Sequence, residues 1–451
     1  MFEYAGWVWW LIVSLGVLVT FHEFGHFWVA RRCGVKVLRF SVGFGQPILR
    51  WHGRDGVEYV IGWIPLGGYV RMLDEREADV PNELLAQAFN RKSVWQRFAV
   101  VLAGPMFNLI LCVFLLWLMF VIGKADYQPI VGKVQGIAAE AGLERDDRIL
   151  AIDGQRMDTW THAQMALATA AVDHRDVALD VMRGNGDSAQ VQLDLSRLQG
   201  ESEPASALRE IGIVPIQFLL DPVVGLVAPD SAAQAAGLKT GDRLLSIAGQ
   251  TLRSWDEIGP LVQLHASAER PLQLVFERDG VRQDVSIQPK LDADASPPRW
   301  LLGVGAPRGS AEYDAMLRFG PLDALGAATD ETWRLTHTTL GVVWRMLRGA
   351  MSLDNLSGPI SIAQYASVSA QMGLAWFLSF LAMLSLSLAI MNLLPIPLLD
   401  GGHLLYYLIE MVKGSPVSER TMIAGQFVGM VLLVGLMGLA FYNDILRLVA
   451  S

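Results

Sequence analysis

Cysteine is almost missing from this chain of 451 residues, which contains only Cys33 and Cys112. With so few thiols a zinc site made of cysteines is excluded, and the cysteine-free stretch 124–373 must fold without disulfides. Any zinc ion bound by this chain would therefore need histidine or carboxylate ligands.

Charge is also scarce, because charged residues make up 18% of the chain and the formal net charge is −9. An acidic balance of this kind gives no sign of nucleic-acid binding. Hydrophobic residues make up 52%, and the mean hydropathy is +0.34. The composition is too apolar for an ordinary soluble protein and too charged for a pure helix bundle, so we expect a membrane protein with a soluble portion.

Four apolar runs come close to the roughly 20 residues that a helix needs to cross the hydrocarbon core. They predict four transmembrane helices, at residues 5–21, 98–123, 374–394 and 422–442. We do not expect the first run to be a cleaved signal peptide, because the basic residues Arg31 and Arg32 follow it and no basic residue precedes it. Basic residues are frequent between the first two runs, so the positive-inside rule predicts that this segment is cytoplasmic. Both termini and the stretch 124–373 then lie outside the cytoplasm.

The motif HEFGH, with His22, Glu23 and His26, directly follows the first run, within an otherwise apolar segment that extends from residue 5 to residue 30. Two histidines four residues apart lie on one face of a helix, so both imidazoles can reach one zinc ion while Glu23 activates the water bound to it. Ionisable side chains are costly at membrane depth and usually mark function. The alternative is that the histidines only pack between helices and that Glu23 extends towards water.

The third run ends in a segment where Pro395 and Pro397 must interrupt the helix, followed by Asp400. Runs one and three cross the membrane in the same direction, so His22, His26 and Asp400 arrive at a similar depth. Two histidines and one carboxylate leave the fourth position of zinc open for water, as in catalytic sites. Two alternatives stay open: Asp400 only ends the helix, or His403 is the ligand in its place.

Residues 131–160 and 224–255 align with each other, which predicts a tandem duplication. Each copy carries the pattern Ala-Gly-Leu followed by Asp-Arg, and this pattern resembles PDZ domains. PDZ domains bind extended peptides by strand addition. We find no glycine-rich carboxylate loop before the first strand of either copy, so the pair acts either as a peptide receptor or as a steric filter.

The cytoplasmic segment is rich in predicted strands, at 37–42, 48–51, 57–63 and 69–72, with turns at 52–56 and 65–68. Residues 313–351 have a loosely helical apolar spacing, which fits an interfacial helix or a plain linker helix. The expected boundaries are 1–33 for the first transmembrane helix, 34–97 for the cytoplasmic loop, 98–123 for the second helix, 124–217 and 218–306 for the PDZ-like domains, 307–373 for the amphipathic helical region, 374–403 for the third helix with the zinc-ligand segment, and 422–446 for the fourth helix.

These motifs, in this order, resemble the bacterial sigma-E-regulating proteases of the site-2 protease family. The resemblance rests on HEFGH, on GPMFN at 104–108, on the PDZ-like repeats, on LSGPI at 356–360 and on NLLPIPLLDGG at 392–402. It implies a polytopic α-helical membrane protein with four transmembrane helices, two extracytoplasmic PDZ-like α+β domains and a membrane-associated β-rich loop. It also implies that His22, His26 and Asp400 bind Zn²⁺, that Glu23 is the catalytic base, and that Asn392 contacts the substrate near the reacting carbonyl.

The resemblance further implies an enzyme of the bacterial inner membrane with a periplasmic PDZ-like pair. Its expected partners are membrane lipids, a single-span substrate such as an anti-sigma factor already trimmed by another protease, and peptide ligands of the PDZ-like domains; remnant signal peptides are further targets. In the family the β-rich loop dips into the membrane and pairs with substrate by strand addition, whereas a plain cytoplasmic hairpin is the alternative. Two other functions stay open: an inactive membrane-anchored PDZ adaptor and a zinc hydrolase of lipids or small molecules.

Overall fold

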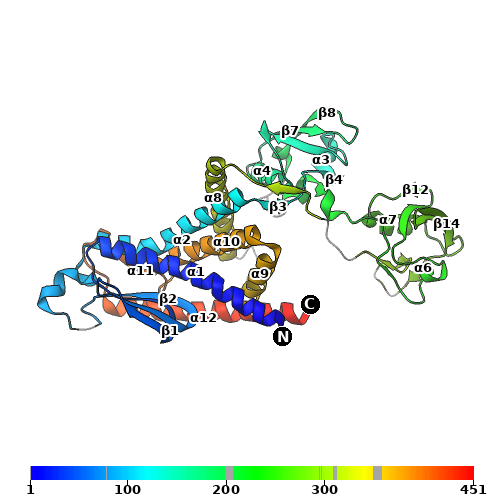
Figure 1. The fold of residues 1–451 in the computed structure, drawn as a ribbon. Coiled ribbons are helices and arrows are strands. Elements are labelled where there is room, and N and C mark those ends of the chain that lie inside the picture. The colour runs from blue at the N-terminus through cyan, green and yellow to red at the C-terminus, as the bar shows by residue number, and fades with distance from the viewer. Residues whose placement is uncertain are drawn as a thin grey trace. The chain divides into compact units, whose positions relative to one another are not determined.

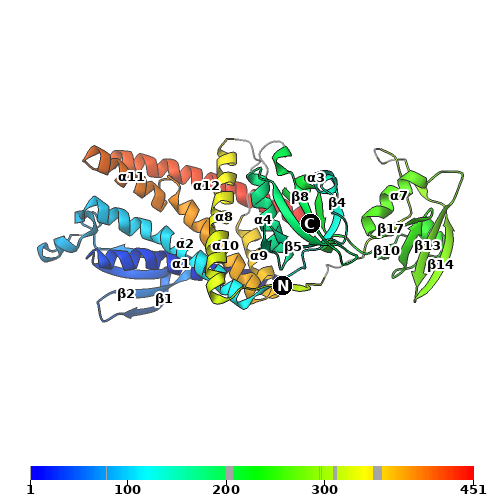
Figure 2. The same cartoon turned by 90° about the horizontal axis from the view of Figure 1, so that it is seen from above.

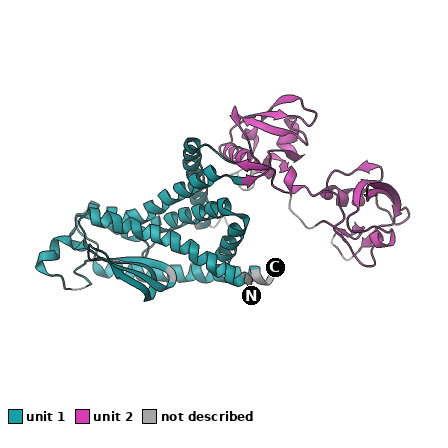
Figure 3. Ribbon diagram, viewed as in Figure 1, with its two compact units in different colours: residues 1–124, 318–451 teal, residues 125–317 magenta. Residues whose placement is uncertain are grey.

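The computed structural model describes residues 2–77, 79–198, 207–293, 295, 297–307, 312–348 and 358–450. The chain forms two compact units, drawn in different colours in Figure 3. Unit 1 consists of Met1–Lys124 and Arg318–Ser451, and unit 2 of Ala125–Leu317. Leu356 and Ser357 of the LSGPI motif lie outside the described residues.

Within its described residues, unit 1 contains four helices that are long and apolar enough to cross a membrane, and each overlaps one of the four predicted runs. They are α1 (Phe2–Arg32), α2 (Val94–Ile122), α10 (Leu374–Leu393) and α12 (Glu419–Ala450). Helix α2 packs between α1 and α10. Gly25 of α1 allows the closest approach, because a Cβ there would lie 2.5 Å from the carbonyl oxygen of Ala103. Helix α12 exposes large apolar side chains such as Phe427 and Val434, as a helix facing lipid would.

The described part of the predicted amphipathic region contains two helices, α8 (Pro321–Leu347) and α9 (Pro359–Met372). Figures 1 and 2 both show α8 running across the direction of α2 and α10. Its N-terminal end is tied to α2, because the Trp117 indole N–H donates a hydrogen bond of 2.9 Å to the carbonyl oxygen of Pro321. Leu322, Trp333 and Trp344 are exposed on α8. This exposure is what the predicted interfacial helix would show.

The segment after α1 forms a sheet from two long bent strands, β1 (Val37–His52) and β2 (Glu58–Met72). Residues 39–42 of β1 have partners in both halves of β2, so that Ser41 lies opposite Val60 and opposite Tyr69. Residues 49–52 pair with residues 58–61. The four predicted strand segments therefore lie in the order 47–52, 58–62, 37–42, 68–72. Two 3₁₀ helices, η1 (Asn82–Gln87) and η2 (Phe89–Arg91), lead from this sheet to α2.

Of the two turns predicted in this sheet, one is confirmed and one is wrong. The turn at residues 52–56 connects β1 and β2, but the turn expected at 65–68 lies inside β2, where the strand bends and Gly67 has a φ of 129°. The matching bend of β1 uses Gly43 and Gly45, with φ of 88° and 85°. Because glycine adopts positive φ without steric cost, these bends replace a second turn.

The two copies in unit 2, each of which contains one of the aligned segments, have the same sheet order, β6-β5-β7-β8 in the first copy and β12-β11-β13-β14 in the second. The strands of the first sheet are β5 (Arg148–Ile152), β6 (Gln155–Arg156), β7 (Val177–Met182) and β8 (Ser188–Leu193), and those of the second are β11 (Arg243–Ile247), β12 (Gln250–Thr251), β13 (Leu272–Arg278) and β14 (Val281–Ile287). Each copy buries its own apolar core.

The remaining elements of unit 2 are short. In the first copy they are β4 (Val131–Val134), α3 (Gly136–Glu140), α4 (Trp160–Val172), η3 (Leu195–Arg197), α5 (Ala207–Ile211), β9 (Ile213–Pro215) and η4 (Ile216–Phe218). In the second copy they are β10 (Leu226–Val227), α6 (Ala232–Ala235), η5 (Trp255–Glu257), α7 (Ile258–His265), β15 (Lys290–Asp292), β16 (Arg299–Leu301) and β17 (Val304–Gly305). At the base of the unit β3 (Lys124–Asp126) pairs with β18 (Ala315–Leu317).

The Asp-Arg pattern that identified the repeat has the same structural role in both copies. Asp147 and Asp242 are buried, and each accepts a hydrogen bond from the backbone N–H three residues before it. Each also pairs with an arginine from just after or at the end of a neighbouring strand: Arg183 lies 2.6 Å from Asp147, and Arg278 lies 2.7 Å from Asp242. A buried carboxylate needs such partners, which explains why the aspartate recurs at equivalent positions.

Candidate metal centre

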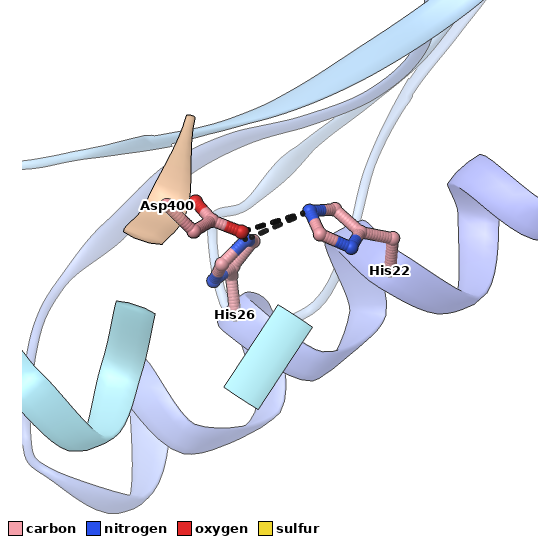
Figure 4. A group of neighbouring side chains, drawn as sticks. All are labelled: His22, His26 and Asp400. Atoms are coloured by element: carbon pink, nitrogen blue, oxygen red, sulfur yellow. Dashed lines mark hydrogen bonds and ion pairs between the residues drawn. The ribbon is translucent and has the colours of Figure 1, made fainter. Parts of the chain in front are cut away.

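His22 and His26 lie one helical turn apart on α1, and their rings point to one side of it (Figure 4). Both are largely buried, with exposed fractions of 9% and 8%. Their Nε2 atoms are 3.3 Å apart. A spacing of this size is expected of two ring nitrogens that are ligands of one cation.

Asp400 brings a carboxylate to the same point from the far end of the chain. Helix α10 ends at Leu393, an irregular segment follows, and Asp400 begins a new helix, α11 (Asp400–Lys413). Its Oδ2 lies 3.2 Å from Nε2 of His22 and 3.4 Å from Nε2 of His26. The structure therefore brings together the three residues that the sequence nominated as ligands (Figure 4).

Helix α11 was not predicted, and it determines where Asp400 lies. Its first turn packs directly on the backbone of the preceding segment, because a Cβ at Gly402 would lie 2.6 Å from the carbonyl oxygen of Ile396 and one at Gly401 would overlap Leu394. Glu410 anchors the last turn to α2 through a 2.6 Å ion pair with Arg97, whose guanidinium also lies 5.0 Å from the ring centroid of Tyr407. Only glycine fits at positions 401 and 402.

The spacing of the three atoms fits a zinc ion. In a tetrahedral site with metal–ligand bonds of about 2.0–2.1 Å, neighbouring ligand atoms lie about 3.3–3.4 Å apart. The three distances between Nε2 of His22, Nε2 of His26 and Oδ2 of Asp400 are 3.2, 3.3 and 3.4 Å. Within the described residues this buried Oδ2 has no hydrogen-bond donor. A cation would satisfy it, so the donor set fits the metal and leaves one tetrahedral position open.

Helix α2 contacts the outer nitrogen of each ring. Nδ1 of His26 lies 2.8 Å from the carbonyl oxygen of Val100, and Nδ1 of His22 lies 3.2 Å from the side-chain amide of Asn108. Between them Gly104 leaves room for both rings, because a Cβ there would lie 2.8 Å from Cε1 of His22 and overlap the ring of His26. The sequence offered Gly104 and Asn108 only as parts of a family motif, and their contact with the histidines was missed.

Glu23 lies beside the three ligand atoms and is not one of the three. Its carboxylate is close enough to His26, His22 and Asp400 to interact electrostatically with each. It also accepts a hydrogen bond from the backbone of Val70, and its Cγ would lie 3.1 Å from a Cβ at Gly68. The end of β2 thus runs along the acidic side chain that the motif nominates as the base.

Asn392 and His403, the two other candidate site residues, lie outside the group of three ligand atoms. Asn392 lies partly buried in the last turn of α10 and makes no hydrogen bond with the part of the chain that the structure describes. His403 lies one turn into α11, where its ring is 6.3 Å from that of Tyr406. It does not belong to the group of ligand atoms, which favours Asp400 among the alternatives that the sequence left open.

Comparisons with known proteins agree along the whole chain. The model of peptidase family M50 matches residues 10–436. A protein of Xylella fastidiosa that is named as a candidate zinc metalloprotease is 49% identical over 448 residues, which are 99% of this chain and 100% of that protein. The regulator of sigma-E protease RseP of Escherichia coli (strain K12) is 42% identical over 442 residues, and its Salmonella typhimurium namesake is 41% identical over 442 residues. Both alignments cover 97% of this chain and 98% of the relative.

The two candidate third ligands can be separated by metal analysis. We expect the purified Asp400→Ala protein to lose most of its zinc, because two imidazoles alone hold the ion weakly. The matched His403→Ala protein should keep the zinc content of the unchanged chain. Zinc per chain, measured by elemental analysis after dialysis, checks both. Full zinc in Asp400→Ala together with loss in His403→Ala would contradict the assignment.

Proposed function

The chain belongs to peptidase family M50 and is a zinc metalloprotease, and from this premise we propose that it hydrolyses peptide bonds within transmembrane segments of single-span proteins. The observation that carries the proposal is the depth of the metal-binding group. Its two histidines lie within α1 and its aspartate follows α10, and both helices are long and apolar enough to span a membrane. A hydrolytic centre at such a depth meets substrates that lie in the membrane.

In this proposal His22, His26 and Asp400 hold the ion, which supplies Lewis-acid chemistry by polarising a carbonyl oxygen and acidifying water. Glu23 takes the proton of the attacking water and passes it to the nitrogen of the leaving amine. Its closeness to all three ligands supports this role. Asn392, which lies in the last turn of α10 and has no hydrogen-bond partner among the described residues, donates a hydrogen bond to the developing oxyanion.

A transmembrane substrate is normally helical, so its peptide bonds must be drawn into an extended form before they can be attacked. Residues 68–72 of β2 form one edge of the sheet, because they pair only with residues 37–42, and they lie next to Glu23. An extended substrate that adds to this edge would present its backbone to the base. The opposite edge, 47–52, is separated from it by three strand spacings, about 14 Å.

The sheet carries the apolar surface that contact with lipid would need. Trp63 is 74% exposed, and Ile48, Leu49 and Trp51 are each at least half exposed. Monomeric proteins rarely leave a group of large apolar side chains to water. This surface supports a sheet that dips into the membrane, which is the arrangement implied by the site-2 protease family.

The substrate class follows from the relatives. Two of them are named as regulators of sigma-E protease, which supports an anti-sigma factor as the substrate and a place in envelope stress signalling. Such a substrate would be trimmed outside the membrane before it is cut, and remnant signal peptides are further substrates. The enzyme would reside in the bacterial inner membrane, with unit 2 and both termini on the periplasmic side.

Unit 2 would select among substrates by the short periplasmic segment that remains after trimming. Its second copy has a cavity of about 380 Å³ between α7 and the strands β10 and β17, lined by Leu226, Ile258, Val262, Trp300 and Val304. The glycine-containing stretch 301–305 lines this cavity and lies at the end of the copy, not before its first strand. An apolar groove beside a strand suits an extended peptide and favours the peptide receptor over the pure steric filter.

Loss of the base should stop catalysis without loss of the metal. We expect Glu23→Gln to cut a model single-span substrate about 10²–10⁴-fold more slowly, because proton transfer by a general base contributes this much. Zinc content should stay that of the unchanged chain. Cleavage assays and elemental analysis on the same preparation check both. Undiminished cleavage by Glu23→Gln would reject Glu23 as the base, and cleavage that survives a zinc chelator would reject a zinc-dependent reaction.

The two sheet edges make opposite predictions for cross-linking. Arg71 and Arg50 are both exposed arginines in surface ion pairs, one on each edge of the sheet. In a Glu23→Gln, Cys33→Ser, Cys112→Ser background, we expect Arg71→Cys to form disulfides with cysteines placed along the substrate span, and Arg50→Cys to form few. Disulfide yield on gels measures this. Equal yields at both positions would support a plain hairpin with no role in substrate binding.

A further inference from the structure

Helix α2 presents one stripe of residues to both histidines. Val100, Gly104 and Asn108 are spaced four residues apart, so they lie on one face of the helix. The carbonyl oxygen of Val100 accepts the Nδ1–H of His26. Gly104 leaves space for the two rings, and the side chain of Asn108 contacts Nδ1 of His22. A backbone carbonyl thus orients one imidazole, and a side-chain amide orients the other.

Asn108 is itself held firmly. It is fully buried, with an exposed fraction of 0%, and its backbone carbonyl oxygen accepts a 2.7 Å hydrogen bond from the hydroxyl of Ser385 on α10. Its amide nitrogen lies 3.2 Å from Nδ1 of His22, and its Oδ1 has no partner within the described residues. Burying an amide in an apolar helix costs free energy unless the amide is hydrogen-bonded. The contact between Asn108 and His22 therefore needs an explanation.

The hydrogen-bonding roles follow from which nitrogen of His22 faces the other ligands. Nε2 points to His26 and Asp400, so it is the metal-binding nitrogen and carries no proton in the loaded site. The proton of the neutral ring then lies on Nδ1, which can only donate. An amide nitrogen also only donates. Rotation of the planar amide by 180° exchanges its oxygen and nitrogen with the same packing, and it turns Oδ1 towards the ring.

We propose that Asn108 is a positioning residue for the metal ligand His22: its Oδ1 accepts the Nδ1–H of the imidazole and holds the ring with Nε2 towards Asp400. The proposal rests on the zinc-binding role of His22 given above. It makes Asn108 the counterpart of the Val100 carbonyl at His26. Partners of this kind raise the basicity of a ligating histidine, and their loss lowers metal affinity about 10–100-fold.

Two substitutions at position 108 separate a hydrogen-bonding role from a packing role. Leucine has nearly the shape of asparagine but accepts no hydrogen bond, whereas aspartate accepts one from Nδ1–H in the arrangement common around zinc-binding histidines. Cys112→Ala is the matched control. It lies one turn further along α2, is equally buried, and contacts Thr332 in place of the histidines.

The experiment measures the zinc affinity of the full-length protein in detergent by competition with a chelator, together with thermal unfolding of the zinc-free protein. We expect Asn108→Leu to bind zinc about 10–100-fold more weakly, Asn108→Asp to stay within a few-fold of the unchanged chain, and Cys112→Ala to match it. Thermal unfolding of the zinc-free form reports on packing alone, so it should not follow the zinc affinities across the three variants.

Two results would overturn the proposal. One is unchanged zinc affinity in Asn108→Leu, and the other is an Asn108→Asp protein as weak as Asn108→Leu, because the side chain then acts only by its packing. Failure of the unchanged chain to bind zinc at all is a different outcome, since it rejects the proposed function as well. The three cases are distinguishable in one series of titrations.

Discussion

Three ionisable side chains lie close together inside a bundle of apolar helices. Their burial costs free energy, and the packing of the surrounding helices holds them where one cation can offset that cost. His22 and His26 come from one helix, and Asp400 comes from a segment more than 370 residues later in the chain. Without a common cation each would be a buried polar group with too few partners. The bundle therefore has to hold them at ligand spacing, and every close approach around them serves that purpose.

Small residues make this spacing possible. Gly25 and Gly104 let α1 and α2 come together at the histidines, and Gly401 and Gly402 let α11 start directly against the irregular segment that follows α10. The 2.6 Å ion pair between Arg97 and Glu410 then ties α11 back to α2. Helix α2 supplies no ligand, yet it contacts both imidazoles and anchors the helix that carries the carboxylate.

Much of the centre could be predicted because its signals are local. The spacing of HEFGH places two histidines on one helix face, and two prolines mark the broken end of a helix before Asp400. The role of Asn108 could not be predicted, because it depends on how α2 packs against α1, and in the sequence it is one polar residue within an apolar run. The bends within β1 and β2 could not be predicted either, because glycines next to strands are compatible with a turn and with a bend in a continuous strand.

X-ray absorption at the zinc edge tests the central claim most directly, because it reports the atoms that surround the metal in the purified protein. The account predicts a first shell of light atoms with the scattering pattern of two imidazoles at about 2.0–2.1 Å and carboxylate or water oxygen in the remaining positions. Thiolate sulfur at about 2.3 Å, for which the chain has only Cys33 and Cys112, or a shell with no imidazole, would contradict it.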